Sequence, residues 1–212
     1  SITRRQRLTS LLQHSKANLS VSTPFAKIYE NAGITALQVI ENGVPFVDEG
    51  ARLPRSPRFD GRVALGHLGG RSAHKGAGLI EVALRRGRYR NLHLTIVDGT
   101  LAPGQSIDTL WGTTPVTITA PYAQSQIAQL YSQLDVLIAP STWPESFGLV
   151  AREALDFGLW VVASNQGAIG QNVDEGRNGY LIDVSTVKDI NEILMKIDTN
   201  HEKYRFTPSI DQ

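Results

Sequence analysis

Two glutamates stand eight residues apart in the stretch STWPESFGLVAREALDFGLWVVASN, residues 141–165. At about 100° per residue, a helix would place Glu153 on the same apolar arc as Leu149 and Phe157. A carboxylate there must reach solvent, pair with another group, or bind the hydroxyls of a ligand. Together with Glu145 it would flank one bound molecule. The structural alternatives are a glutamate that reaches out of the arc and, for Glu145, a helix-capping acid.

Two glycines and two cations occur together in GHLGGRSAHKG. Gly69 and Gly70 would let the backbone approach a ligand closely. Arg71 can bind a diphosphate bidentately and Lys75 as a point charge, next to the predicted start of a helix. The alternative is a simple turn with two solvated cations. The segment contains neither GxGxxG nor the Walker pattern GxxxxGK, so neither of those phosphate-binding mechanisms is supported.

A second anion-binding group is expected in PSTWPESFGLVAREAL. Two prolines break the chain there, so the helix is predicted to begin near Ser146 or Phe147. Its first amides, those of Phe147, Gly148 and Leu149, would point toward a ligand. Gly148 has no side chain that would block an approaching phosphate.

Apolar runs alternate with helical patterns from residue 62 onward. Most of the runs are apolar without strict alternation, which is typical of strands buried on both faces of a parallel sheet. The predicted strands are residues 62–69, 92–99, 116–120, 135–141, 159–164 and 179–184, and the predicted helices are residues 76–86, 123–134, 148–157 and 187–197. This order predicts an α/β fold with a Rossmann-like doubly wound parallel sheet, whose ligands bind outside the carboxyl ends of the strands.

The first part of the chain has a different pattern. Residues 1–44 are predicted to form a helix, a strand, a second helix and a second strand, and are interpreted as the end of a preceding domain, since the chain starts with Ser1 directly in a helix. Residues 45–61 are predicted to be a linker and residues 62–212 a ligand-binding domain. The first helix, TRRQRLTSLLQHS, is basic and amphipathic; it would lie on a membrane surface or, alternatively, pack on the preceding domain.

Composition excludes several classes of protein. The chain has 212 residues, 41% of them hydrophobic, which is enough for one sizeable core or one and a half domains. A net charge of +1 gives no global attraction to nucleic acid. Cysteine is absent and the five histidines lack metal-binding spacing, so no metal site is expected. No run is long enough to span a membrane and no signal peptide opens the chain, so a cytoplasmic location is expected.

These residues resemble a known enzyme family. ESFGLVAREAL resembles the E-x-F-G-x4-E-A signature, often called EX7E, of the family-four retaining glycosyltransferases of the GT-B fold. The segments VIENGVP, GGRSAHKG, IVDGT and EGRNGYLI resemble further motifs of the family, in the family's order. Trp160 departs from the pattern by replacing a common proline, and Arg71 departs by standing four residues before Lys75 rather than five. The resemblance implies the C-terminal, donor-binding half of a GT-B fold.

The resemblance also implies roles for individual residues at a nucleotide-diphosphate-sugar site that needs no cofactor and no metal. Glu153 would bind the ribose hydroxyls. Glu145, the implied catalytic residue, would hold the donor sugar near the reacting carbon, and the base would lie near residues 119–122. Arg71 and Lys75, with the amides near Gly148 and Leu149, would carry the diphosphate. The implied donor-binding residues are Gly70, Arg71, Lys75, Ser146, Phe147, Gly148, Leu149 and Glu153. Charge that builds up on the leaving diphosphate would be stabilised there, with an oxocarbenium-like transition state.

The sequence is compatible with three candidate functions, which are not equally favoured. The first is the donor-binding domain of a retaining glycosyltransferase of polysaccharide biosynthesis, acting on a saccharide or lipid-linked acceptor. It would need the missing N-terminal domain for activity and would stay in the cytoplasm or peripherally on the inner face of the membrane. The alternative is a catalytically inactive sugar-nucleotide-binding module on the same fold. The third, a dehydrogenase, is disfavoured because GxGxxG is absent.

Overall fold

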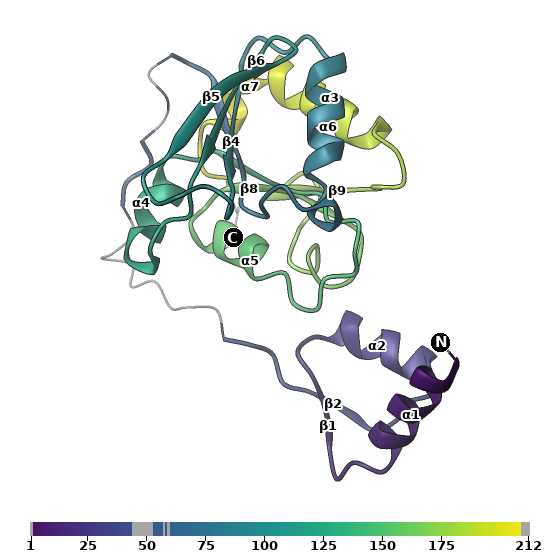
Figure 1. The fold of residues 1–212 in the computed structure, drawn as a ribbon. Helices are drawn as coiled ribbons and strands as arrows, with labels where there is room; N and C mark the ends of the chain where they lie inside the picture. Colours follow the sequence, from purple (N-terminus) through teal and green to yellow (C-terminus); the bar gives the residue numbers. More distant parts are fainter. Residues whose placement is uncertain (1, 44–52, 57, 59, 209–212) are drawn as a thin grey trace.

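A computed structural model describes residues 2–43, 53–56, 58 and 60–208 of the chain. Much of the predicted linker, residues 45–61, therefore lies outside the described residues. From residue 62 onward the chain folds around one seven-stranded sheet with helices on both faces (Figure 1). The strands are β3 (Val63–His67), β4 (Leu92–Val97), β5 (Ser106–Trp111), β6 (Thr114–Thr119), β7 (Val136–Ala139), β8 (Trp160–Ser164) and β9 (Gly179–Ile182).

The strand order is β5-β6-β4-β3-β7-β8-β9. All neighbouring strands are parallel except β5 and β6, which pair antiparallel at one edge. The chain passes from β3 to β4, continues to the edge strand β5 and turns back into β6, which lies between β5 and β4. It then returns to the other side of β3 and winds outward through β7, β8 and β9. The predicted doubly wound sheet is confirmed, and its order reverses between β3 and β7, where ligands bind in such folds.

Helices cover both faces of this sheet. They are α3 (Ala77–Arg86), α4 (Ile127–Ser132), α5 (Leu149–Asp156), α6 (Lys188–Thr199) and α7 (His201–Tyr204), with the short 3₁₀ turns η2 (Ala73–Lys75) and η3 (Gln124–Gln126). One buried cluster joins α3 and α6 to one face, and a second joins α4 and α5 to the other. Burial on both faces explains why the strands are apolar without alternation.

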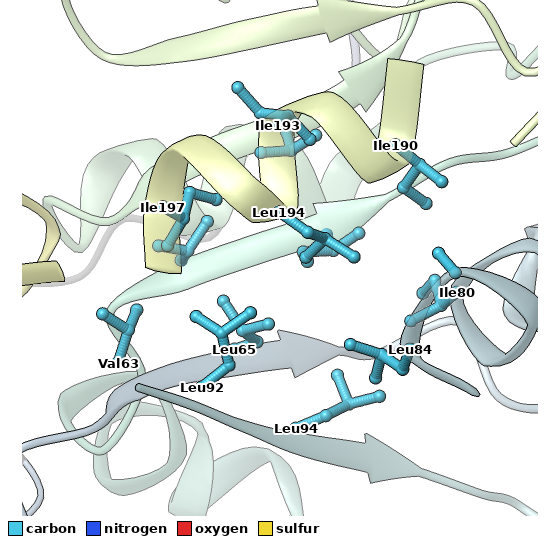
Figure 2. Close-up of a cluster of buried hydrophobic side chains, with 14 of the residues drawn as sticks. Val63, Leu65, Ile80, Leu84, Leu92, Leu94, Ile190, Ile193, Leu194 and Ile197 are labelled. Carbon is cyan, nitrogen blue, oxygen red and sulfur yellow. The ribbon is translucent and has the colours of Figure 1, made fainter. Parts of the chain in front are cut away.

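Figure 2 shows the larger of the two clusters. Leu194 and Ile197 of α6 and Leu84 of α3 point toward strand residues that include Leu65 and Leu94. All of these side chains are fully buried, and each contributes about 1.5–3 kcal/mol relative to exposure to water. This core holds the carboxyl ends of β3 and β4 in place.

Three elements differ from the sequence prediction. Strand β5 was not predicted, because an edge strand whose residues are exposed except for Trp111 has no buried apolar run. The helix predicted over residues 123–134 is the turn η3 followed by the short helix α4. Helix α7 follows α6 and was also not predicted. Trp160, the departure from the family pattern, anchors α7: its indole Nε1 donates to the Phe206 carbonyl at 3.1 Å and its ring packs on Tyr204.

The first part of the chain forms a separate two-stranded parallel sheet with two helices, in the predicted order (Figure 1). Its elements are α1 (Ile2–Gln13), β1 (Asn18–Ser20), α2 (Thr23–Asn31) and β2 (Leu37–Val39). The hydroxyl of Ser22 caps α2 by accepting from the amide of Phe25 at 3.2 Å. Leu8 and Leu11 of α1 are exposed. None of the helices in the described residues combines the length and apolarity needed to cross a membrane.

Candidate functional site

A cavity of about 360 Å³ lies at the reversal of strand order, at the carboxyl ends of β3 and β7. Six of the predicted site residues line it, namely Lys75, Glu145, Ser146, Phe147, Gly148 and Leu149. His67, Gly69 and Ser141, which follow or end the two strands, line it as well. The sheet therefore brings two sequence-distant segments to one place, as the strand-end argument predicts.

Glu145 and Lys75 form the polar centre of the cavity. Lys75 Nζ donates to Glu145 Oε1 at 2.6 Å, and Ser141 Oγ lies 2.8 Å from the same oxygen. Oε2 of Glu145 has no hydrogen-bond partner in the described part of the chain. The capping interpretation of Glu145 is wrong, because residue 148 is the N-cap of α5 and the carboxylate faces Lys75 instead. One carboxylate oxygen is thus held by the fold and the other is open to a ligand.

The loop that carries Glu145 is held by close backbone contacts with the segment after β8. The Glu145 carbonyl accepts from the amide of Ala168 at 2.8 Å. A Cβ on Gly167, whose φ is +69°, would lie 2.4 Å from that carbonyl oxygen. Gly148 has φ +74°, and a Cβ there would lie 2.5 Å from Ile169 Cα. A glycine is therefore required at position 148, because the backbone is left-handed there and because a side chain would collide with Ile169. This structural reason adds to the predicted one, that glycine leaves space for a phosphate.

Helix α5 begins at Leu149, later than the predicted start at Ser146 or Phe147, because the left-handed conformation of Gly148 interrupts the helical backbone. The amides of Phe147, Gly148, Leu149 and Val150 donate to no acceptor among the described residues. All four residues line the cavity. Unpaired amides at a helix N-terminus favour an anion, so anion binding here stays a prediction, now for a helix that starts at Leu149.

The turn after β3 positions Lys75. A Cβ on Gly69 would lie 2.9 Å from Lys75 Cβ, and Gly70 has φ +69°. Of the predicted residues in this turn, Gly70 and Arg71 are absent from the cavity lining. Arg71 is exposed. The turn therefore brings Lys75 to the site and leaves Arg71 exposed, outside the cavity lining.

His67 is a buried member of the site that the sequence analysis missed. Its Nδ1 lies 2.9 Å from the Ile138 carbonyl of β7, and its Nε2 lies 3.0 Å from the Gly70 carbonyl. The imidazole thus lies between the turn after β3 and β7, and its single N–H, when the ring is neutral, donates to one of these two carbonyls. Burial lowers the pKa of His67, which favours the neutral ring. A polar residue at the end of the apolar run VALGH was the available signal.

Glu153 lies one turn beyond the part of α5 that lines the cavity. It is three residues after Val150 and four after Leu149, so it shares their helix face. Its side chain is buried at 8% exposure and Oε2 accepts from the Tyr131 hydroxyl at 2.9 Å. Glu153 is outside the described lining of the cavity itself. The interpretation that it reaches out to solvent is wrong, because it is buried and paired.

The N-terminal segment contacts the glutamate loop directly. Ser22 Oγ donates to the Ser146 carbonyl at 2.6 Å, and Ser22 is fully buried. On α5, the Arg152 guanidinium lies over the Phe147 ring at 4.0 Å and 3.4 Å from the Glu41 carboxylate. Among the described residues, no group of three or more acidic or histidine side chains is placed to hold a metal ion.

Part of the chain is similar in sequence to known glycosyltransferases. D-inositol 3-phosphate glycosyltransferase of Rhodococcus opacus is 40% identical over 74 residues, a match that covers 35% of this chain and 16% of that enzyme. The chain thus matches only a small part of that relative's length.

Solved structures show the same fold. HepE of Anabaena, in complex with UDP and glucose, superposes with a TM-score of 0.72 at 20% identity over 97% of this chain and 60% of HepE. The C-terminal domain of LpcC, a group 1 family protein of Francisella tularensis, superposes with a TM-score of 0.55 at 19% identity over 76% of this chain and 92% of that domain. Residues 64–206 match the family model of the group 1 glycosyl transferases. Because that match spans more than half of the chain, the chain belongs to the group 1 glycosyl transferases, with a GT-B type Rossmann-like domain.

Proposed function

We propose that this chain carries the donor site of a retaining glycosyltransferase of the EX7E type, which transfers a sugar from a nucleoside diphosphate to a saccharide or lipid-linked acceptor. One observation carries the proposal. In the part of the chain that the structure describes, a lysine-paired carboxylate with one open oxygen and four amides without an acceptor share a single cavity where the strand order reverses. A hydroxyl-rich ligand with a diphosphate matches both halves of that arrangement.

In the proposed complex, the diphosphate binds Lys75 and the amides at the start of α5. The open oxygen of Glu145 accepts hydroxyls of the donor sugar, and Glu153 accepts the ribose hydroxyls one helix turn away. Gly70 and Arg71 contact the diphosphate from the turn after β3. The base lies near residues 119–122, where burial and, to a smaller extent, the nearby Glu153 carboxylate raise the pKa of Tyr122 to about 12.

The chemistry follows from these positions. As the bond between the anomeric carbon and the diphosphate breaks, negative charge grows on the leaving group. Lys75 and the amides stabilise that charge from fixed positions. Glu145 lies on the sugar side, where positive charge develops on the anomeric carbon. In this proposal the protein supplies the stabilising charges, and no cofactor or metal is required.

The whole protein's partners follow from the same proposal. Residues 1–44 are the end of a preceding acceptor domain, residues 45–61 are the linker, and this chain is the C-terminal half. The contacts of Ser22 and Glu41 with the glutamate loop and α5 support this arrangement. The basic helix α1 makes a peripheral contact with the inner face of a membrane, and the protein acts in polysaccharide biosynthesis in the cytoplasm.

Glu153→Ala tests the donor site. We expect it to weaken binding of the nucleoside diphosphate by about 1.5–3 kcal/mol, or roughly 10- to 150-fold, because hydrogen bonds to a charged acceptor are lost. Calorimetric titration with UDP, GDP and ADP measures the effect, with NAD as a ligand control. UDP is the first probe because HepE was solved with UDP. Glu192→Ala is the matched control, since Glu192 is an exposed glutamate on α6.

Two outcomes separate the candidate functions. Unchanged affinity in Glu153→Ala would contradict the ribose assignment. Binding without turnover by the whole protein would favour the inactive sugar-nucleotide-binding module, whereas turnover would exclude it.

A further inference from the structure

Glu153 accepts a side-chain hydrogen bond from the hydroxyl of Tyr131. Tyr131 is fully buried on α4, and its hydroxyl lies 2.9 Å from Glu153 Oε2 and 3.5 Å from the Val150 carbonyl. A phenol has one proton to donate, and the shorter contact to the charged acceptor takes it. The fold thus holds one of the two carboxylate oxygens.

The ring of Tyr131 is itself fixed. It stacks on Phe157 with 4.7 Å between ring centroids and 12° between planes. Phe157 follows Glu153 by one turn at the end of α5. The hydroxyl therefore has little freedom to follow a moving carboxylate, and the carboxylate is oriented by a rigid donor.

The second oxygen of Glu153 is unpaired. Within the described residues, Oε1 has no hydrogen-bond partner. Oε1 is not among the buried atoms that lack a partner, so it keeps contact with solvent although most of the residue is buried. A ligand hydroxyl can therefore reach it and replace that solvent with a hydrogen bond to a charged acceptor. The arrangement matches that of Glu145, where Lys75 and Ser141 surround one oxygen and leave the other open.

We propose that Tyr131 is a positioning residue for the donor site: its hydroxyl holds Oε2 of Glu153 so that Oε1 faces the ribose hydroxyls. This inference rests on the proposed function, because it needs a ribose next to Glu153. Tyr131 lies 22 residues before Glu153 and is not part of the E-x-F-G-x4-E-A signature.

The charges around Glu153 support a second effect of the same hydroxyl. Burial raises the pKa of Glu153, the Tyr131 hydrogen bond lowers it, and Asp156 on the same helix raises it. Tyr122, in the loop after β6, is near enough to Glu153 for the carboxylate to add to the effect of burial in raising the pKa of the tyrosine. Tyr131 is thus the neighbour that favours the ionised carboxylate, which is the form that accepts two hydroxyls.

Tyr131→Phe tests the proposal, since it keeps the stack on Phe157 and removes only the hydroxyl. Affinity is measured for UDP, 2′-deoxy-UDP and 3′-deoxy-UDP, or for the same set of GDP or ADP if that base binds. We expect the preference for the ribonucleotide over its deoxy analogues to fall by about fivefold to tenfold. We also expect Tyr131→Phe to lose affinity at a higher pH than the wild-type protein does when the pH is lowered. Without the hydroxyl the pKa of Glu153 rises, so the carboxylate is protonated earlier during acidification.

Tyr204→Phe is the matched control. Tyr204 is also a fully buried tyrosine, and its hydroxyl lies 3.0 Å from the Tyr180 hydroxyl, remote from the cavity lining. It should lower stability without changing the ribose preference. An equal loss of affinity for all three nucleotides in Tyr131→Phe would show a structural role only and would overturn the proposal, as would no change.

Failure of the proposed function gives a different result. If the wild-type protein binds none of the three diphosphates, or if Glu153→Ala keeps the full ribose preference, the donor site is misassigned and the positioning role falls with it. If Glu153→Ala loses the preference and Tyr131→Phe keeps it, only the positioning role is wrong.

Discussion

Replacing Glu145 with glutamine is expected to lower donor turnover by about 10²- to 10³-fold without weakening the binding of UDP. Glutamine keeps the size of the side chain but removes the charge that faces the developing positive charge on the sugar. Lys75, whose Nζ lies 2.6 Å from Glu145 Oε1, would then have no competing carboxylate and would bind the diphosphate at least as well. The measurement is UDP release from UDP-glucose by the whole protein, beside calorimetry with UDP.

Lys75→Met separates the proposed diphosphate-binding role of Lys75 from the proposed sugar-binding role of Glu145. It removes the positive charge and keeps much of the apolar stem, so both turnover and UDP affinity should fall. Glu145 is then left without its ion-pair partner in the empty site. If Glu145→Gln instead weakens UDP binding as much as Lys75→Met, the main role of Glu145 is to hold Lys75 in place for the diphosphate, and its assignment to the sugar is wrong.

The central strands could be predicted because both of their faces are buried. In β3 all five residues are buried, so the apolar run itself marks the strand. In β5 only Trp111 is buried, and its pairing with β6 depends on backbone hydrogen bonds that leave no pattern of hydrophobicity. The start of α5 was misplaced for a related reason. The left-handed backbone of Gly148 delays the helix start, and this residue packs against the backbone of Ile169, which is distant in sequence.

The members of the site were easier to predict than their pairing. Lys75 and Glu145 were placed at one edge because parallel strands end together, although they are 70 residues apart. That they pair with each other in the unliganded protein depends on side-chain geometry, which residue spacing does not contain. His67 and Tyr131 carried the same signal as Glu153, a polar group within an apolar pattern, but neither belongs to the recognised motif.

Gly76→Ala is expected to destabilise the protein by about 2–5 kcal/mol. Gly76 has φ +79°, and a Cβ there would lie 2.0 Å from the carbonyl oxygen of Pro140. The left-handed backbone costs about 1–2 kcal/mol for a residue with a side chain, and overpacking adds about 1–3 kcal/mol. For a chain of this size each kcal/mol lowers Tm by about 2–4 °C. Thermal unfolding followed by circular dichroism measures the loss.

Gly78→Ala is the control for that substitution, two residues further on. Gly78 lies inside α3 with nothing within 4 Å of an added Cβ, so alanine there should stabilise the helix by about 0.5–1 kcal/mol. Unchanged melting of Gly76→Ala would mean that the Pro140 contact relaxes freely. The same contact also brings Lys75 to Ser141 and Glu145, because the amide of Thr142 donates to the His74 carbonyl at 2.9 Å beside it. Folded Gly76→Ala protein should therefore bind UDP more weakly, since the close packing of Gly76 on Pro140 also brings the side chains of the site together.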